Sequence, residues 1–263
     1  MHQRLTGILG KLDRADEHLE SLEIEVARFL YGKPYEVVGE LNREERAWYF
    51  ILRVYRDPPV RIATIIGDTA HNLRSALDHL VWQLVDSSGG TPSSRNAFPI
   101  ALYEREWRDR APNRLAELRS PSAVAEIQRL QPYMRRHATG APTRHPLAVL
   151  NRISNIDKHQ LLLPTVGIFE GLRSDAWYAG NEDVPGITDT LLLPMPGSTL
   201  KDKTPLVRLD LAAPLGENPE VKVYGLTPFR VVLGKRGKPP EEALGTIAAF
   251  IREDVIPRFE RFF

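Results

Sequence analysis

The amino-acid sequence predicts an α+β protein in which several long helices pack with a mostly antiparallel sheet. Two segments, 35–55 and 160–235, are rich in β-branched and aromatic residues between proline and glycine turns, which favours strands. We therefore expect a single α+β domain over 1–263, with a possible subdivision into a mainly helical part, 1–160, and a β-rich part with a closing helix, 161–263. Apolar residues recur at three- and four-residue spacing, which is typical of helices, in four segments: 3–31, 60–86, 144–156 and 240–262.

The helices are predicted from their apolar stripes and from the residues that end them. The first helix carries a leucine-rich stripe and ends where Gly32, Lys33 and Pro34 follow. The segment 60–86 gives the strongest helical pattern in the chain, and the Ser- and Gly-rich segment 87–98 after it predicts a flexible loop. Shorter helices are predicted at 103–110 and 121–130.

The strands are predicted from short β-favouring runs bounded by turn residues. Tyr35–Leu41 and Arg46–Tyr55 form the first two, and Asp57-Pro58-Pro59 breaks the pattern after them. The chain changes character after His159. The later strands are predicted in the segments LLLPTVGIF, TDTLLLPM, PLVRLDL and EVKVYGLTPFRVVL.

Composition excludes several classes of function. The 263-residue chain has a formal net charge of +1, so no strong overall field should draw it to nucleic acid or membrane. The chain has no cysteine, which excludes thiol nucleophiles, disulfides and iron–sulfur ligation. The N-terminal segment is charged and lacks an apolar run, and we expect no signal peptide, no membrane span and a cytoplasmic location.

The helix predicted at 60–86 has an unusual polar face opposite its leucine stripe. Solvated helix faces are usually built from Glu and Lys, whereas this face uses Asn, Ser, Asp and His, which are poorer helix formers. Such a departure from local preference often marks a functional site. The alternative is a polar network that fixes helix packing, since Arg74 and Asp78 are spaced to form an ion pair. The residues of this face are Asp68, His71, Asn72, Arg74, Ser75, Asp78, His79, Trp82 and Gln83.

A second polar cluster ends the helix predicted at 144–156 and comprises Asn155, Asp157, Lys158 and His159. Lys and His at a helix C-terminus complement the helix dipole, which is one explanation of this cluster. The other is that this end packs against the polar face, where Asp157 would orient an imidazole and Lys158 would contact an anion.

The spacing argues against a metal site built by the polar helix itself. His71 and His79 would lie roughly 12 Å apart along a helix, too far to share one ion. Asp68 and His71 have a usable spacing, and a metal, if bound, would be held by Asp68, His71 and His159. We expect no cofactor. Histidine can act as a general acid or base near neutral pH, and arginine can hold a phosphate, so this face suits cleavage of RNA without a metal.

The arginine followed after four residues by histidine, Arg74 to His79, resembles the motif of the HEPN superfamily. Many members are metal-independent ribonucleases of toxin–antitoxin, phage-defence and RNA-processing systems, and they commonly dimerise to form a composite site. The resemblance implies Arg74 and His79 as the catalytic pair, with Asp78 and Asn72 as orienting residues. The strings HNLRSALDHLVWQL and NIDKH also resemble an uncharacterised bacterial protein family.

The leading hypothesis is therefore a HEPN-like, metal-independent RNA-cleaving or RNA-binding protein that forms a homodimer. The alternatives are a non-enzymatic protein that binds a small molecule or partner at the 67–86 helix, and a metal-dependent hydrolase. The expected catalytic residues are Arg74, His79, Asp78 and His71. The expected substrate-binding residues are Asn72, Ser75, Asn155, Asp157, Lys158 and His159.

Overall fold

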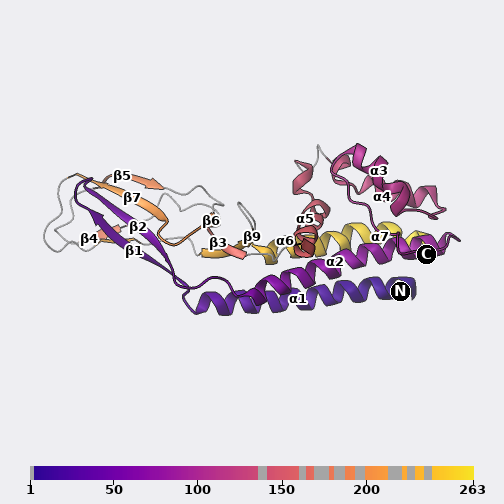
Figure 1. The fold of residues 1–263 in the computed structure, drawn as a ribbon, viewed down its shortest axis with the longest axis horizontal. Helices are drawn as coiled ribbons and strands as arrows, with labels where there is room; N and C mark the ends of the chain where they lie inside the picture. The colour runs from indigo at the N-terminus through magenta and orange to yellow at the C-terminus, as the bar shows by residue number, and fades with distance from the viewer. Residues whose placement is uncertain are drawn as a thin grey trace. The chain divides into compact units, whose positions relative to one another are not determined.

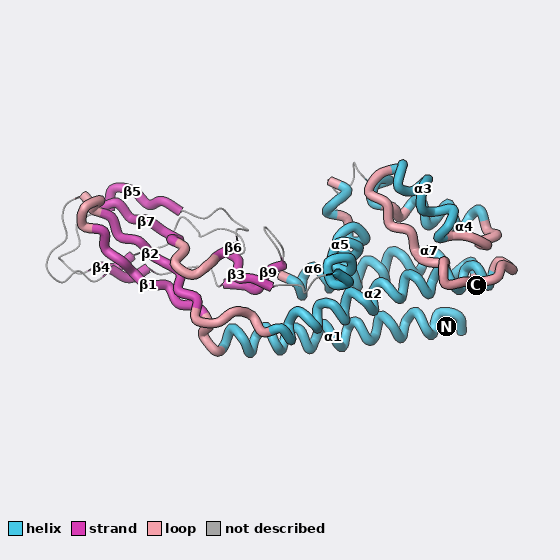
Figure 2. The backbone as a smooth tube through the Cα atoms, in the orientation of Figure 1, coloured by secondary structure: helices cyan, strands magenta, loops and turns pink. Residues whose placement is uncertain are grey.

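The computed structural model shows an α+β fold, as the sequence predicts (Figures 1 and 2). By its contacts the chain divides into two units, which we call the helical unit and the sheet unit. The helical unit comprises Met1–Ile24, Arg61–Leu162 and Glu241–Phe263, and the sheet unit comprises Glu25–Val60 and Leu163–Pro240. The structure describes residues 3–135, 141–159, 164–168, 178–180, 187–192, 199–212, 221–223, 229–233 and 239–263.

This division differs from the boundary near residue 160 that the sequence suggested. The hairpin over 35–54 belongs to the sheet unit, and the closing helix belongs to the helical unit. Each element joins the unit in which its apolar side chains are buried. Phe50 and Leu52 of the hairpin pack with Val207 and Leu209, whereas Leu244 of the closing helix is fully buried in the helical unit.

The helices agree with the predicted ones to within a few residues at each end. The long helices α1 and α2 are drawn side by side in Figure 1. A short 3-10 turn, Gln3–Leu5, precedes α1, and α6 continues through a π-helical turn, Phe250–Val255, into α7. Short 3-10 turns also occur at Pro132–Arg135, Pro142–Arg144 and Glu260–Phe262. The α-helices are α1 (Thr6–Tyr31), α2 (Val60–Ser87), α3 (Glu104–Arg114), α4 (Pro121–Arg129), α5 (Pro146–His159), α6 (Pro240–Ala249) and α7 (Ile256–Phe259).

Polar contacts fix how the helices of the helical unit are paired. Arg4, just before α1, pairs with Asp86 near the end of α2, so the two helices run antiparallel. Arg252, in the closing helical segment, lies 3.2 Å from Asp13 and 2.6 Å from Asp16 of α1. The buried apolar stripes lie on the predicted faces, including Ile8, Leu12, Leu22, Leu73, Leu77, Leu80, Leu84, Ile247 and Ile251.

The segment between α2 and α3 contains neither helix nor strand, as predicted, but it is anchored at several points and so differs from the flexible loop expected over 87–98. The Asn96 side chain donates to the Ala116 carbonyl at 2.8 Å, and the Ala101 amide donates to the Gln131 side chain at 2.9 Å. Phe98 is fully buried. The loop therefore packs as part of the helical unit.

The sheet unit contains antiparallel sheets of four, three and two strands among the described residues. The four-stranded sheet has the order β1-β2-β7-β5. Its apolar face gathers Phe50, Leu52, Val207 and Leu209. The strands are β1 (Tyr35–Asn42), β2 (Ala47–Val54), β3 (Pro164–Ile168), β4 (Tyr178–Gly180), β5 (Ile187–Leu192), β6 (Thr199–Leu200), β7 (Pro205–Leu211), β8 (Val221–Val223) and β9 (Phe229–Leu233).

Candidate functional site

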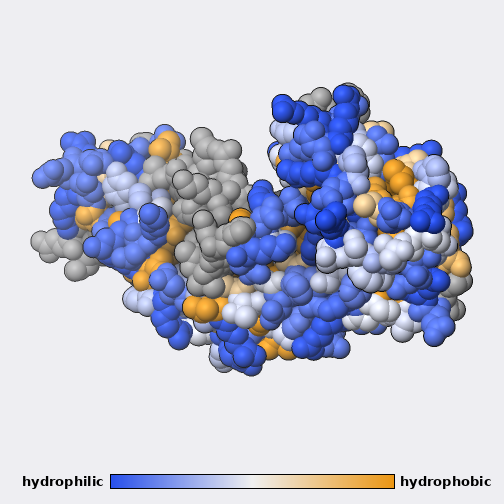
Figure 3. Space-filling view, turned by 45° about the vertical axis from the view of Figure 1, so that its right-hand side comes forward, coloured by the Kyte–Doolittle hydropathy of each residue, from blue (hydrophilic) through white to orange (hydrophobic). Residues whose placement is uncertain are grey.

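The polar face of α2 lies opposite a completely buried leucine stripe. Leu73, Leu77 and Leu80 are 0% exposed, whereas His71 and His79 are exposed. Trp82 is also exposed, although tryptophan is usually covered. The helical unit presents a largely hydrophilic surface in Figure 3, with apolar patches scattered across it. The helix therefore supplies one side to the core and presents imidazoles and an indole on its other side.

Arg74 and Asp78 together hold the backbone of the buried residue Phe98. The Arg74 Nε donates to Asp78 Oδ2 at 3.3 Å, and its Nη2 lies 3.0 Å from Asp78 Oδ1. The same Nη2 donates to the Phe98 carbonyl at 2.6 Å, and the Phe98 amide donates to Asp78 Oδ1 at 2.8 Å. A buried loop residue has no strand or helix to satisfy its backbone groups, so this pair supplies both partners. We call Arg74, Asp78 and the Phe98 backbone the loop clamp.

His71 lies on the same side of α2 as the loop clamp. Residues three apart on an α-helix differ by about 60° around the axis, so His71 and Arg74 are neighbours on its surface. The His71 Nε2 and the Ser75 Oγ are 3.4 Å apart, one helical turn from each other. Both residues keep access to solvent, since His71 is exposed and Ser75 is partly exposed. His71 and Arg74 therefore share one side of α2, and the Arg74 guanidinium is held on Asp78 and Phe98.

His79 lies elsewhere on α2. Its Nδ1 is 3.9 Å from the position of a Cβ at Gly7, so the imidazole lies beside α1. Residues five apart differ by about 140° around a helix, which separates His79 from Arg74. The two residues of the Arg-x4-His motif therefore face different neighbours within this chain.

The end of α5 packs directly on α2. The Asp157 carboxylate occupies the space that a Cβ at Gly67 would need, with its Oδ2 3.0 Å from that position. Gly67 lies one helical turn before His71, so Asp157 approaches the same polar face. Asn155 and Lys158 are exposed at this end of α5. His159 belongs to α5, and its side chain lies outside the described residues.

The remaining residues of the polar face divide into buried and exposed groups. Asn72 is buried, and its amide nitrogen donates to the Asp68 carbonyl at 2.9 Å, which satisfies that donor within the helix. Asp68 is exposed near His71. Among the side chains that the structure describes, no three His, Asp or Glu residues converge as metal ligands. The set of Asp68, His71 and His159 stays a prediction, because the His159 side chain lies outside the described residues.

Two residues that position the site were not singled out from the sequence. Gly67 is an isolated glycine within a helix, which usually has a packing reason, and this pattern could have identified it. Phe98 gave no such signal, because its role depends on backbone contacts to residues twenty or more positions away.

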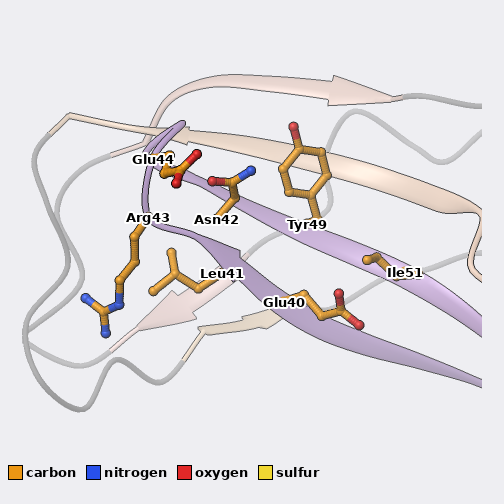
Figure 4. A pocket seen from close by; sticks show the side chains of 7 residues that line it. All are labelled: Glu40, Leu41, Asn42, Arg43, Glu44, Tyr49 and Ile51. Carbon is orange, nitrogen blue, oxygen red and sulfur yellow. The ribbon is translucent and has the colours of Figure 1, made fainter.

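The sheet unit has a polar surface of its own, at the tip of the β1–β2 hairpin (Figure 4). The Tyr49 hydroxyl donates to Glu45 at 2.6 Å, and this hydrogen bond raises the pKa of Tyr49. Arg208 lies 3.1 Å from Glu45 and 2.8 Å from Asp210. These side chains satisfy one another. An open groove beside them is lined by Glu40, Leu41, Asn42, Arg43, Glu44, Tyr49 and Ile51.

The chain was compared with protein-family models, with curated proteins and with solved structures. No match was found in any of the three comparisons. None of the helices in the described part of the chain is long and apolar enough to cross a membrane. Functional inference therefore depends on the geometry of the α2 face.

Proposed function

We propose that the protein binds RNA and cleaves it without a metal ion at the exposed face of α2. The observation that carries this proposal is the exposed imidazole of His71 on the same side of α2 as Arg74, whose guanidinium is held in place by the loop clamp. An imidazole exchanges protons near neutral pH, and a guanidinium stabilises negative charge on a phosphate. RNA supplies its own nucleophile, the 2′-hydroxyl.

The contacts of Arg74 suit it for a fixed phosphate-binding role. A guanidinium has five N–H donors, and within the described part of the chain the hydrogen bonds of Arg74 use Nε and Nη2 and none uses Nη1. The Arg74 side chain remains 17% exposed, so a phosphate oxygen can reach it. A donor held in place before the substrate binds needs little rearrangement in the transition state. Lys158 and Asn155, exposed on α5, extend the surface for phosphate contacts.

His71, in place of His79, is the proposed proton-transfer residue. His71 shares a side of α2 with Arg74, whereas His79 lies beside Gly7 of α1. RNA cleavage needs a base for the 2′-hydroxyl and an acid for the leaving oxygen. The His71 side chain of one subunit can take one of these two roles. In a homodimer, the same histidine of the second subunit would take the other. A composite site in a homodimer agrees with the resemblance to HEPN ribonucleases of toxin and phage-defence systems, whereas the choice of His71 departs from it, because the motif implies His79.

The test is incubation of the protein with labelled single-stranded RNA in the presence of EDTA. We expect cleavage by the unmodified protein and a loss of about 100-fold or more in rate for His71→Ala, the usual contribution of general acid–base catalysis. His18→Ala, a partly buried histidine of α1, is the matched control and should cleave normally. Absence of cleavage by the folded, unmodified protein would refute the catalytic proposal.

A second candidate, non-enzymatic binding, is favoured by one observation. Arg74 and Asp78 already satisfy the Phe98 backbone, which gives both residues a structural task. In that case the face would bind its ligand without changing it. Retention of intact RNA by the protein, with a retention that His71→Ala weakens, would select this candidate.

A further inference from the structure

Trp82 is an exposed aromatic residue on the proposed RNA-binding face. Its exposed fraction is 43%, whereas Trp107 in α3 is 8% exposed. On α2, Trp82 is displaced from His71 by about 20° around the axis and about 16 Å along it. An indole left in water on the same face as a phosphate-binding group is available to an aromatic ligand.

The carboxylates next to Trp82 on α2 are neutralised by arginines. Asp78, one turn before it, pairs with Arg74 at 3.0 Å. Asp86, one turn after it, pairs with Arg4, which also donates to Gln83 at 3.3 Å. A polyanion approaching the indole therefore meets an arginine on each side and no uncompensated charge from these two aspartates.

We infer that Trp82 stacks on an unpaired base, so that the substrate class of the proposed nuclease is single-stranded RNA. This inference rests on the proposed function. Bases within a duplex are already stacked and shielded, whereas unpaired bases stack readily on aromatic side chains. The distance from Trp82 to His71 places the stacked base away from the cleaved bond, so Trp82 positions the strand and takes no part in proton transfer.

The test measures binding of a short labelled RNA, free and annealed to its complement, by fluorescence anisotropy. All proteins carry His71→Ala to keep the RNA intact. Trp82→Ala should weaken binding of the single strand roughly tenfold and leave duplex binding unchanged, and Trp82→Phe should keep most of the affinity. Tyr103→Ala, which removes an aromatic residue that is 57% exposed, is the control and should have no effect.

The outcomes separate this inference from the proposed function. Unchanged single-strand affinity in a folded Trp82→Ala variant, or equal affinity for duplex and single strand, would overturn the inference. The proposed function would survive that result if the protein with His71 intact still cleaves RNA in EDTA. No binding and no cleavage by any form would overturn both.

Discussion

The polar face of α2 and the polar face of the four-stranded sheet contain similar residue types and use them differently. On the sheet, Arg208 bridges Glu45 and Asp210, so the side chains satisfy one another. On α2, Arg74 and Asp78 satisfy the backbone of Phe98, and His71 stays exposed on the same side of the helix. Charge composition alone does not distinguish a functional surface from a solvated one. The hydrogen-bond and ion-pair partners of the charged groups distinguish the two kinds of surface.

The largest expected effect on stability comes from breaking the loop clamp. Arg74→Ala leaves the Phe98 carbonyl without its donor and Asp78 without its cation, and it should lower the free energy of unfolding by about 3 kcal/mol. Urea-induced unfolding followed by circular dichroism measures the change. Arg53→Ala, which breaks an exposed pair with Glu40, is the matched control and should cost less than about 1 kcal/mol. Equal losses for the two variants would show that the clamp is no stronger than a surface ion pair.

A smaller effect tests the contact between Asp157 and Gly67. Replacing a glycine within a helix by alanine normally stabilises a protein by about 1 kcal/mol. Gly10→Ala in α1, where among the described residues no atom outside the adjoining helix backbone lies within 4 Å of the new Cβ, should show this gain in thermal unfolding. Gly67→Ala should not, because its Cβ displaces the Asp157 carboxylate.

The double variant isolates the cause of this difference. Gly67→Ala in an Asp157→Ala background should recover the gain that Gly10→Ala shows, since the carboxylate is no longer in the way. If Gly67→Ala alone stabilises the protein as much as Gly10→Ala, then α5 does not rest on α2 at this point.

The sheet unit should respond to alkaline pH through Tyr35. Burial, and then the charge of Asp57, raise the pKa of Tyr35 above its ordinary value of 10.0. The unfolded chain therefore loses this proton at a lower pH than the folded chain does, and stability should fall as the pH rises above 10.0. Tyr35→Phe should flatten this part of the pH dependence of unfolding, and Tyr31→Phe, at a side chain 90% exposed, should not. An unaltered profile in Tyr35→Phe would contradict the assignment.

The smallest effect is expected from the polar network of the sheet. Tyr49→Phe removes the hydroxyl that donates to Glu45 and leaves Arg208 paired with both carboxylates. Because the network is exposed, the urea midpoint should barely change. A loss as large as that of Arg74→Ala would mean that the sheet surface, and not the α2 face, is the more tightly constrained of the two.

The elements could be predicted because their signals are local and periodic. The spacing of Leu73, Leu77, Leu80 and Leu84 predicted the buried side of α2, and the aromatic and β-branched residues of 47–54 predicted β2. The assignment of the hairpin to the same unit as β7 was not accessible, because it depends on contacts between Phe50 and Val207 that are remote in sequence.

The residues of the candidate site were proposed from the sequence, and their arrangement was not. The polar face of α2 followed from its helical wheel, whereas the loop clamp depends on the path of the loop through Phe98. Asp157 was expected to approach an imidazole, and the structure places its carboxylate against Gly67, one turn away from His71. The separation of His79 from Arg74 around α2 follows from helix geometry, so the five-residue spacing in the sequence was sufficient to predict it.

The most direct test of this account compares His71→Ala with His79→Ala in EDTA-resistant cleavage of single-stranded RNA. The geometry predicts that His71→Ala abolishes cleavage, because His71 shares the Arg74 side of α2, and that His79→Ala cleaves at nearly the rate of the unmodified protein. Circular dichroism spectra that match the unmodified protein establish that both variants are folded. Loss of cleavage in His79→Ala with normal cleavage in His71→Ala would contradict the account and return the catalytic role to the Arg-x4-His motif.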